Sequence, residues 1–222
     1  MSYDTVAFIL AGPFFIAILV GSILLKRAFS LRKFLPEEFA LAFAWVFVVG
    51  SLIWLAVYLS DSTLLGFGTP WTWLAAAHFM FAGFGALTIT ALSCSVVADS
   101  RMRRVLRTLL IAHPIAYLIT AAGISGYPFC DELGASCYLL IFTTEFWAVN
   151  FGKPNRMALY PRLLLTLALA VPVLTLMPAE AWAFGRPIFD LAEMVQYHGI
   201  VNAVGHVGLG LIAFFWGRPP LQ

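Results

Sequence analysis

Seven long apolar runs divide the sequence and limit what it can fold into. They cover about residues 5–25, 39–59, 70–98, 105–125, 135–151, 157–178 and 187–216. A helix that crosses a bilayer needs about 20 mostly apolar residues. Because backbone polar groups cannot stay unpaired in lipid, such runs fold as helices. The sequence therefore predicts an all-α, polytopic membrane protein: a seven-transmembrane-helix bundle that forms a single domain over residues 1–222.

The composition excludes an ordinary soluble protein. Hydrophobic residues make up 62% of the chain and charged residues 11%, whereas soluble domains carry about 25% charged residues. The formal net charge of +2 says little about partners. Cys130 and Cys137 lie in or beside one predicted outer loop, where a disulfide and two free thiols are both possible.

The basic residues predict how the chain is oriented in the membrane. Of the 13 Lys and Arg residues, all except Arg186 follow the first, third, fifth or seventh run. They are Lys26, Arg27, Arg32, Lys33, Arg101, Arg103, Arg104, Arg107, Lys153, Arg156, Arg162 and Arg218. The positive-inside rule then places the N-terminus outside and the C-terminus in the cytoplasm. Cytoplasmic flanks account for these charges, so no nucleic-acid partner is expected.

A few ionisable residues lie within the apolar runs. Counted from the outer ends, His78, Glu145 and His198 fall near one depth, slightly outside the midplane, with Asp190 and Glu193 above them. Such residues are costly in lipid and usually face the bundle interior, where they take part in function or bind a neighbouring helix. The sequence predicts that these side chains converge in one lipid-shielded chamber.

The last run carries polar residues at helical spacing. His198, Asn202 and His206 stand at i, i+4 and i+8, so they share one ridge that should face a pocket or a neighbouring helix. Interhelical packing is the simplest role for Asn202 and for each single histidine. His113, which precedes Pro114, is expected to form a helix-to-helix bond at a kink.

Two segments resemble motifs of the YndJ-like bacterial membrane proteins. AAAHFMFAGFG (75–85) is similar to a His-Phe-His-Tyr-Ala-Gly-Phe motif through His78, Phe79, Ala82, Gly83 and Phe84. MVQYHGIVNAVGH (194–206) is similar to a Met-Val-x-x-His-Gly-x-x-Asn-Ala-x-Gly-Phe motif. Its matching residues are Met194, Val195, His198, Gly199, Asn202, Ala203 and Gly205. Met80 and His206 depart from the two motifs, and the loss of a His-x-His pair weakens a metal-binding interpretation.

The resemblance implies an integral-membrane cyclase of terpenoid or indole-terpenoid (meroterpenoid) substrates, a group that the family includes. The partners would be a lipophilic, prenylated small molecule and membrane lipid, with no cofactor and no metal. Such cyclisation needs an acid for an alkene or epoxide, a dry cavity, and aromatic faces that stabilise carbocations. Glu145 would be the acid, and Asp190 or Glu193 would assist it or take the final proton. His78 and His198 would orient the acid or act as the base.

Polar and aromatic residues near the same depth are expected to contact the substrate. Tyr197 and Asn202 would hold an epoxide oxygen or a polar head group. The remaining predicted substrate-binding residues are Phe79, Trp71, Phe142, Trp147 and Met194. Most aromatic residues of a membrane protein belong to its core or interfacial belt, which is the alternative role for each.

Two other function classes use the same residues. A proton-coupled transporter or channel could use the acids and histidines as a relay, although the two halves lack a matching pair of Gly/Pro-broken helices. A metal enzyme could use His78, His198, His206 and Glu145 as ligands. His198 and His206 lie about 12 Å apart along a straight helix, so one ion could not bind both.

Overall fold

The computed structural model describes residues 1–31 and 34–219. These residues form two compact units, Met1–Thr88 and Ile89–Gln222, which we describe separately. Throughout the described ranges the chain is helical, apart from turns and an isolated bridge between Leu64 and Phe67. Arg32 and Lys33, two of the basic loop residues used to predict orientation, lie outside the described residues.

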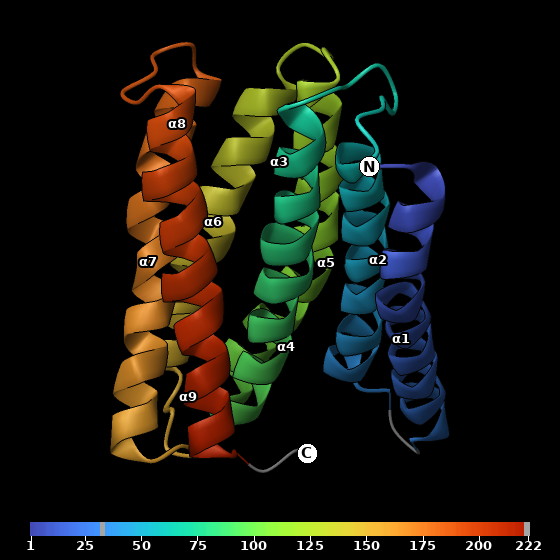
Figure 1. The fold of residues 1–222 in the computed structure, drawn as a ribbon. Helices are drawn as coiled ribbons and strands as arrows, with labels where there is room; N and C mark the ends of the chain where they lie inside the picture. The colour runs from blue at the N-terminus through green and yellow to red at the C-terminus, as the bar shows by residue number, and fades with distance from the viewer. Residues whose placement is uncertain (32–33, 220–222) are drawn as a thin grey trace. The chain divides into compact units, whose positions relative to one another are not determined.

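The first unit contains three neighbouring helical runs (Figure 1). Helix α1 (Tyr3–Ser30) begins where the Ser2 side chain accepts a hydrogen bond from the Thr5 amide. Helix α2 (Pro36–Leu59) begins with a proline, whose missing N–H is harmless in the first turn. Helix α3 (Trp71–His78) continues directly into the π-helical segment η1 (Phe79–Gly85). An Arg27–Glu38 ion pair of 2.9 Å links the end of α1 to the start of α2.

Rings that pack over glycines hold α2 against η1. The Phe79 ring covers Gly50, and the Phe47 ring covers Gly83, so closely that a Cβ atom at either glycine would overlap the ring. The two rings also contact each other, with centroids 6.0 Å apart. Phe79 and Gly83 belong to the first of the two motifs, and their role here is close helix packing.

The second unit begins inside α4 (Ala86–Val96) and contains four further helical runs. Three are uninterrupted: α5 (Ser100–Ile124), α6 (Cys130–Phe151) and α7 (Leu159–Ala183). The last begins with the short α8 (Leu191–Glu193), passes through the π-helical segments η2 (Met194–Ile200) and η3 (Asn202–Gly208), and ends with α9 (Leu209–Gly217). Figure 1 shows α7 beside this last run, and α7 contacts η2, η3 and α9.

The turn after α4 is fixed to the turn after α6. The amides of Ala98 and Asp99 donate to the carbonyl groups of Lys153 and Gly152, at 3.2 and 3.0 Å. The Asp99 side chain caps α5 by accepting from the amides of Met102 and Arg101, and these bonds lower the pKa of its carboxyl group. The same turn therefore sets the relative positions of α4, α5 and α6, the helices that carry the buried polar residues described below.

The structure confirms that the described chain is all-helical and has long apolar helices of the kind that cross a membrane. Six helical runs among the described residues are long and apolar enough to cross a membrane. The runs are Tyr3–Ser30, Pro36–Leu59, Trp71–Val96, Ser100–Ile124, Leu159–Ala183 and Leu191–Gly217. The remaining predicted span, the fifth, corresponds to α6, which has 22 residues but whose hydropathy is lowered by polar residues such as Glu145 and Asn150. Cys130 and Cys137, for which two states were open, carry free thiols.

Replacing Gly83 with alanine tests the ring-over-glycine packing. We expect Gly83→Ala to lower the free energy of unfolding by about 1–3 kcal/mol, because the added methyl group overlaps the Phe47 ring. Gly12→Ala is the control, since nothing lies within 4 Å of the position of its Cβ atom. That control should be neutral or stabilising by up to about 1 kcal/mol. Equal unfolding free energies for the two variants in detergent would contradict the packing.

Candidate functional site

A buried carboxyl group marks the centre of the second unit. Glu145 of α6 is 0% exposed. Its Oε2 atom accepts a hydrogen bond of 3.0 Å from the Thr90 hydroxyl, and its Oε1 atom accepts one of 3.3 Å from the Ser93 hydroxyl. Thr90 and Ser93 stand three residues apart on α4, which places both hydroxyl groups on the face toward α6. The carboxyl group is thus held by neutral donors, and no ion pair to it occurs within residues 1–31 and 34–219.

An imidazole ring joins this network through Thr90. The Nε2 atom of His113 lies 2.9 Å from the Thr90 hydroxyl oxygen, and His113 on α5 is itself buried. Three helices, α4, α5 and α6, therefore meet at the string His113–Thr90–Glu145. The other ring nitrogen of His113, Nδ1, is buried without a hydrogen-bond partner among the described residues.

Aromatic rings pack beside His113, at the end of this string away from Glu145. The Phe142 ring, one turn before Glu145 on α6, contacts His113 on one side and His206 on the other, with centroid distances of 5.3 and 5.2 Å. Both contacts are edge-to-face. Tyr138 stacks on Phe142 at 5.9 Å, and its hydroxyl group is also buried without a partner. The cluster combines one carboxyl group, two imidazoles and two aromatic rings, and none of these residues forms an ion pair with another part of the chain that the structure describes.

The polar ridge of the last helical run faces α7. The Nδ1–H of His198 donates to the Thr175 carbonyl oxygen at 2.9 Å, and the Asn202 amide donates to the Thr175 hydroxyl at 2.7 Å. Two turns further along, the Nδ1–H of His206 donates to the Ala168 carbonyl at 3.0 Å. The predicted ridge therefore lies against a neighbouring helix, and only His206 also reaches the aromatic cluster.

The structure changes the predicted partner of Glu145. The hydrogen-bond partners of Glu145 are Thr90 and Ser93, and the imidazole next to them belongs to His113. His198, which was expected to share the site, binds Thr175 instead. The prediction assumed that residues of equal depth converge, but depth alone does not say toward which neighbour each helix turns its side chains.

Asp190 and Glu193, the two predicted outer carboxylates, lie at the start of α8. The Asp190 side chain accepts from the Glu193 amide at 2.8 Å, and the Glu193 side chain accepts from the Asp190 amide at 3.0 Å. This reciprocal arrangement is a capping box, and both residues are exposed. The structure shows the two side chains capping the start of α8, and their predicted catalytic role stays a prediction.

The predicted substrate-binding residues lie in four different places. Phe142 lies in the aromatic cluster, and Asn202 lies against α7. Phe79 packs over Gly50. The others lie at or near the surface of the described structure: Trp71, Trp147, Tyr197 and the half-buried Met194. Of these, Tyr197 contacts the Phe189 ring at 5.2 Å.

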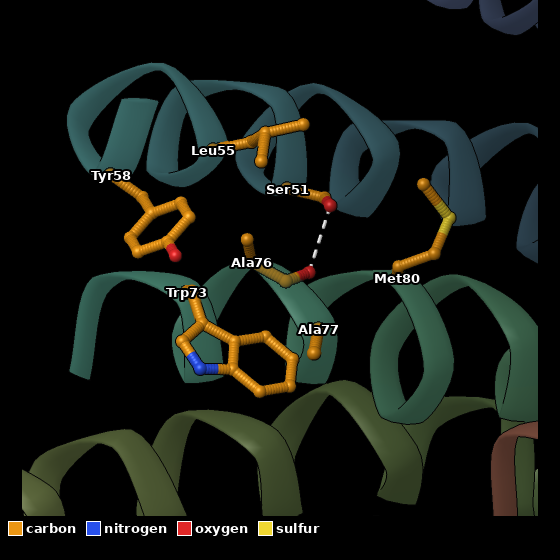
Figure 2. Close-up of a pocket in the computed structure, with 7 residues that line it drawn as sticks. All are labelled: Ser51, Leu55, Tyr58, Trp73, Ala76, Ala77 and Met80. Carbon is orange, nitrogen blue, oxygen red and sulfur yellow. Dashed lines mark hydrogen bonds between the residues drawn. The ribbon is translucent and has the colours of Figure 1, made fainter. Parts of the chain in front are cut away.

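The first unit has an apolar groove next to the first motif (Figure 2). It lies between α2 and the run α3–η1, has a volume of about 370 Å³, and is lined by Ser51, Leu55, Tyr58, Trp73, Ala76, Ala77 and Met80. The Ser51 hydroxyl on the α2 side of the groove donates to the Ala76 carbonyl at 2.8 Å, so this hydroxyl group is already paired. His78 is exposed, and its Nδ1–H donates to the Leu74 carbonyl at 2.8 Å.

Both motif segments adopt π-helical geometry. The first includes η1, and the second spans η2 and most of η3. π-Helical turns are rare and occur often at functional sites. A family model described as YndJ-like protein matches residues 1–206. The chain belongs to the YndJ-like family. No curated protein and no solved structure matches it.

The metal-binding alternative lacks a ligand set in the part of this YndJ-like protein that the structure describes. No three His, Cys, Asp or Glu side chains come together there as they would around a metal ion. His206, one of the four suggested ligands, uses Nδ1 for Ala168 and directs its ring against Phe142.

Four residues of the cluster were not among the predicted site residues: Thr90, Ser93, His113 and Tyr138. His206 was predicted only as a ligand of the metal-enzyme alternative. Two signals pointed to Thr90, Ser93 and His113. The hydroxyl residues Thr90 and Ser93 share a face of an otherwise apolar run, and His113 was expected to bond to a neighbouring helix. That expected bond exists, and its acceptor is Thr90.

Removing the Asn202 amide tests the contact with α7. We expect Asn202→Ala to lower the free energy of unfolding by about 0.6–2 kcal/mol, the range for interhelical hydrogen bonds in membranes. Gln196→Ala is a matched control, because Gln196 is an exposed amide on the same helical run. Denaturation of both variants in mixed micelles measures the difference. No destabilisation beyond that of the control would show that the amide does not hold η3 to α7.

Proposed function

We propose that this YndJ-like protein is an integral-membrane terpene or meroterpenoid cyclase in which Glu145 protonates an alkene or epoxide of a prenylated substrate. The observation that carries the proposal is the enclosure of the Glu145 carboxyl group, which is hydrogen-bonded to Thr90 and Ser93 and shielded from solvent. A carboxyl group that its surroundings keep neutral can donate a proton at neutral pH. No cofactor is needed for this chemistry.

The groups around Glu145 suit a cationic reaction. Phe142 and Tyr138 present aromatic rings beside the cluster, and aromatic faces stabilise a carbocation without bonding to it. His206 and His113 each have a ring nitrogen without a hydrogen-bond partner, and such a nitrogen is able to take the final proton. In this proposal the substrate displaces side chains packed over the carboxyl group. The π-helical η3 carries His206 against Phe142 and is the segment we expect to yield.

A lipophilic substrate agrees with the groove in the first unit. Its volume of about 370 Å³ lies in the range of roughly 300–1,000 Å³ that is common for small-molecule sites. The lining is apolar except for Ser51 and the polar atoms of Tyr58 and Trp73, which lie toward one end of the groove in Figure 2. We assign this groove to the hydrocarbon tail of a prenylated molecule or of a membrane lipid.

A proton-coupled carrier is the second candidate. It is favoured by the string His113–Thr90–Glu145, because three linked polar groups from three helices could pass a proton within the membrane. The two candidates differ in outcome. A cyclase changes the lipid-soluble metabolites of its host, whereas a carrier changes the distribution of a solute and leaves those metabolites as they were.

Replacing Glu145 with glutamine tests the proposed acid. We expect Glu145→Gln to abolish formation of cyclised, lipid-soluble products in a host that supplies linear or epoxidised prenyl substrates, because the amide cannot donate the proton. Comparison of lipid extracts from hosts with and without the gene measures this. Glu180→Gln is the matched control, since Glu180 on α7 also accepts a serine hydroxyl, that of Ser136, and should retain activity. Full product formation by Glu145→Gln would remove Glu145 from the mechanism.

The proposed function includes seven membrane spans, with α6 as the fifth, an outer N-terminus and a location in the bacterial plasma membrane. Labelling of single cysteines in intact cells tests this arrangement. With Cys94, Cys130 and Cys137 replaced, Leu65→Cys should react with an impermeant maleimide, because it is exposed in the loop between the second and third spans. Asn155→Cys, exposed in the loop after α6, should react only after the membrane is opened. The reverse pattern would contradict the orientation.

A further inference from the structure

We propose that His113 and Thr90 form a proton relay that loads and unloads the carboxyl group of Glu145. The three groups are joined in series, with 2.9 Å between His113 Nε2 and Thr90 Oγ1 and 3.0 Å between Thr90 Oγ1 and Glu145 Oε2. All three residues are buried. The inference rests on the proposed function in one respect: an acid that gives up its proton in each turnover must be loaded again.

The direction of the hydrogen bonds follows from the number of available protons. A hydroxyl group has one proton to donate, and before loading, while Glu145 is a carboxylate, Thr90 donates it to Glu145. The Thr90 oxygen is then the acceptor toward His113, so Nε2 carries a proton and donates it. In the neutral ring Nδ1 is left with a lone pair, and Nδ1 is the buried ring nitrogen that lacks a partner among the described residues.

This arrangement allows a balanced transfer. A hydronium ion gives a proton to Nδ1 of His113 and leaves as water, and the proton on Nε2 passes to the Thr90 oxygen. The original Thr90 hydroxyl proton passes to Oε2 of Glu145. His113 is again neutral with its proton on Nδ1, Thr90 is again a hydroxyl group, and Glu145 has gained one proton. The reverse sequence unloads it.

Nδ1 of His113, at the end of the relay away from Glu145, lies near two other polar atoms that have no hydrogen-bond partner among the described residues. The Tyr138 hydroxyl of α6 is buried and unpaired, and its ring centroid is 5.9 Å from that of His113. The Nε2 atom of His206 of η3 likewise lacks a partner among the described residues, and both imidazoles contact the Phe142 ring. Buried polar atoms are nearly always hydrogen-bonded, so three such atoms in one cluster without a partner among the described residues need an explanation. A place where a water molecule delivers or removes a proton is such an explanation.

Ser93 offers an internal control. Its hydroxyl donates to Oε1, the other oxygen of the same carboxyl group, but it has no hydrogen bond to His113. Loss of the Ser93 hydroxyl therefore removes a hydrogen bond to Glu145 without interrupting the relay. Loss of the Thr90 hydroxyl removes a hydrogen bond to Glu145 and interrupts the relay. If the relay operates, loss of the Thr90 hydroxyl slows proton transfer to Glu145 much more than loss of the Ser93 hydroxyl does.

The experiment follows the protonation of Glu145 by infrared spectroscopy after a rapid pH change, with the full-length protein in lipid nanodiscs. The carboxyl band is the one missing from Glu145→Gln. We expect Thr90→Val to slow protonation by about tenfold or more, since positioned proton-transfer groups contribute on the order of 10²–10⁴-fold to rates. Thr90→Ser, which keeps the hydroxyl group, should restore the rate. Ser93→Ala should shift the pH midpoint of the band and slow protonation far less than Thr90→Val does.

Equal rates in Thr90→Val and Ser93→Ala would overturn the relay. If Thr90→Val does not fold, His113→Gln decides by the same measurement, because the amide side chain cannot pass a proton from one nitrogen to another. A normal rate in His113→Gln would likewise overturn it. The measurement needs no substrate, so it separates the two proposals. A working relay without cyclised products rejects only the proposed function, and cyclised products with no change of rate in Thr90→Val reject only the relay.

Discussion

The hydrogen bonds from Thr90 and Ser93 to Glu145 are the interaction on which the second unit depends. A carboxyl group inside a helical membrane protein must have partners, because no water is available to solvate it. Here the partners come from α4, and His113 extends the network to α5. The main-chain bonds of Ala98 and Asp99 to the turn after α6 fix the ends of the same helices. Turn and network together determine which faces of α4, α5 and α6 meet.

Around this network the chain places groups that suit chemistry better than packing alone would require. Phe142 separates two imidazoles, and three buried polar atoms nearby have no partner among the described residues. A cluster that served only stability would gain by pairing these atoms or by replacing them with apolar groups. The second motif segment, π-helical through η2 and η3, reaches this cluster through His206. The contact between Phe142 and His206 therefore joins the second motif segment to the groups on which the proposed chemistry depends.

The helices could be predicted from the sequence because hydropathy is a local property. The expected run 157–178 corresponds to Leu159–Ala183, and the other runs agree as closely. The burial of Glu145 was also predictable, since a lone carboxyl group in an apolar run has to face inward. The capping box of Asp190 and Glu193 had a sequence signature, Asp-x-x-Glu before a helix, which indicated a structural role that the functional interpretation passed over.

The partners of Glu145 could not be predicted in the same way. Counting residues from the ends of the spans gives depth, and at equal depth His198 was as suitable as any other imidazole. Which histidine approaches depends on the rotation of each helix, and the π-helical segments change that rotation from the regular 100° per residue of an α-helix. His113, Thr90 and Ser93 meet Glu145 because of tertiary packing between helices whose residues are up to 55 positions apart in the chain.

A double-mutant cycle between Thr90 and Glu145 tests the central claim most directly. The free energy of unfolding would be measured in mixed micelles for Thr90→Val, Glu145→Gln and the double variant, with an Asn202→Ala and Glu145→Gln cycle as the reference. We predict a coupling energy of about 0.5–3 kcal/mol between Thr90 and Glu145, and additivity within about 0.5 kcal/mol in the reference cycle. Additive effects of Thr90→Val and Glu145→Gln would show that the two side chains do not bind each other, which would contradict the account.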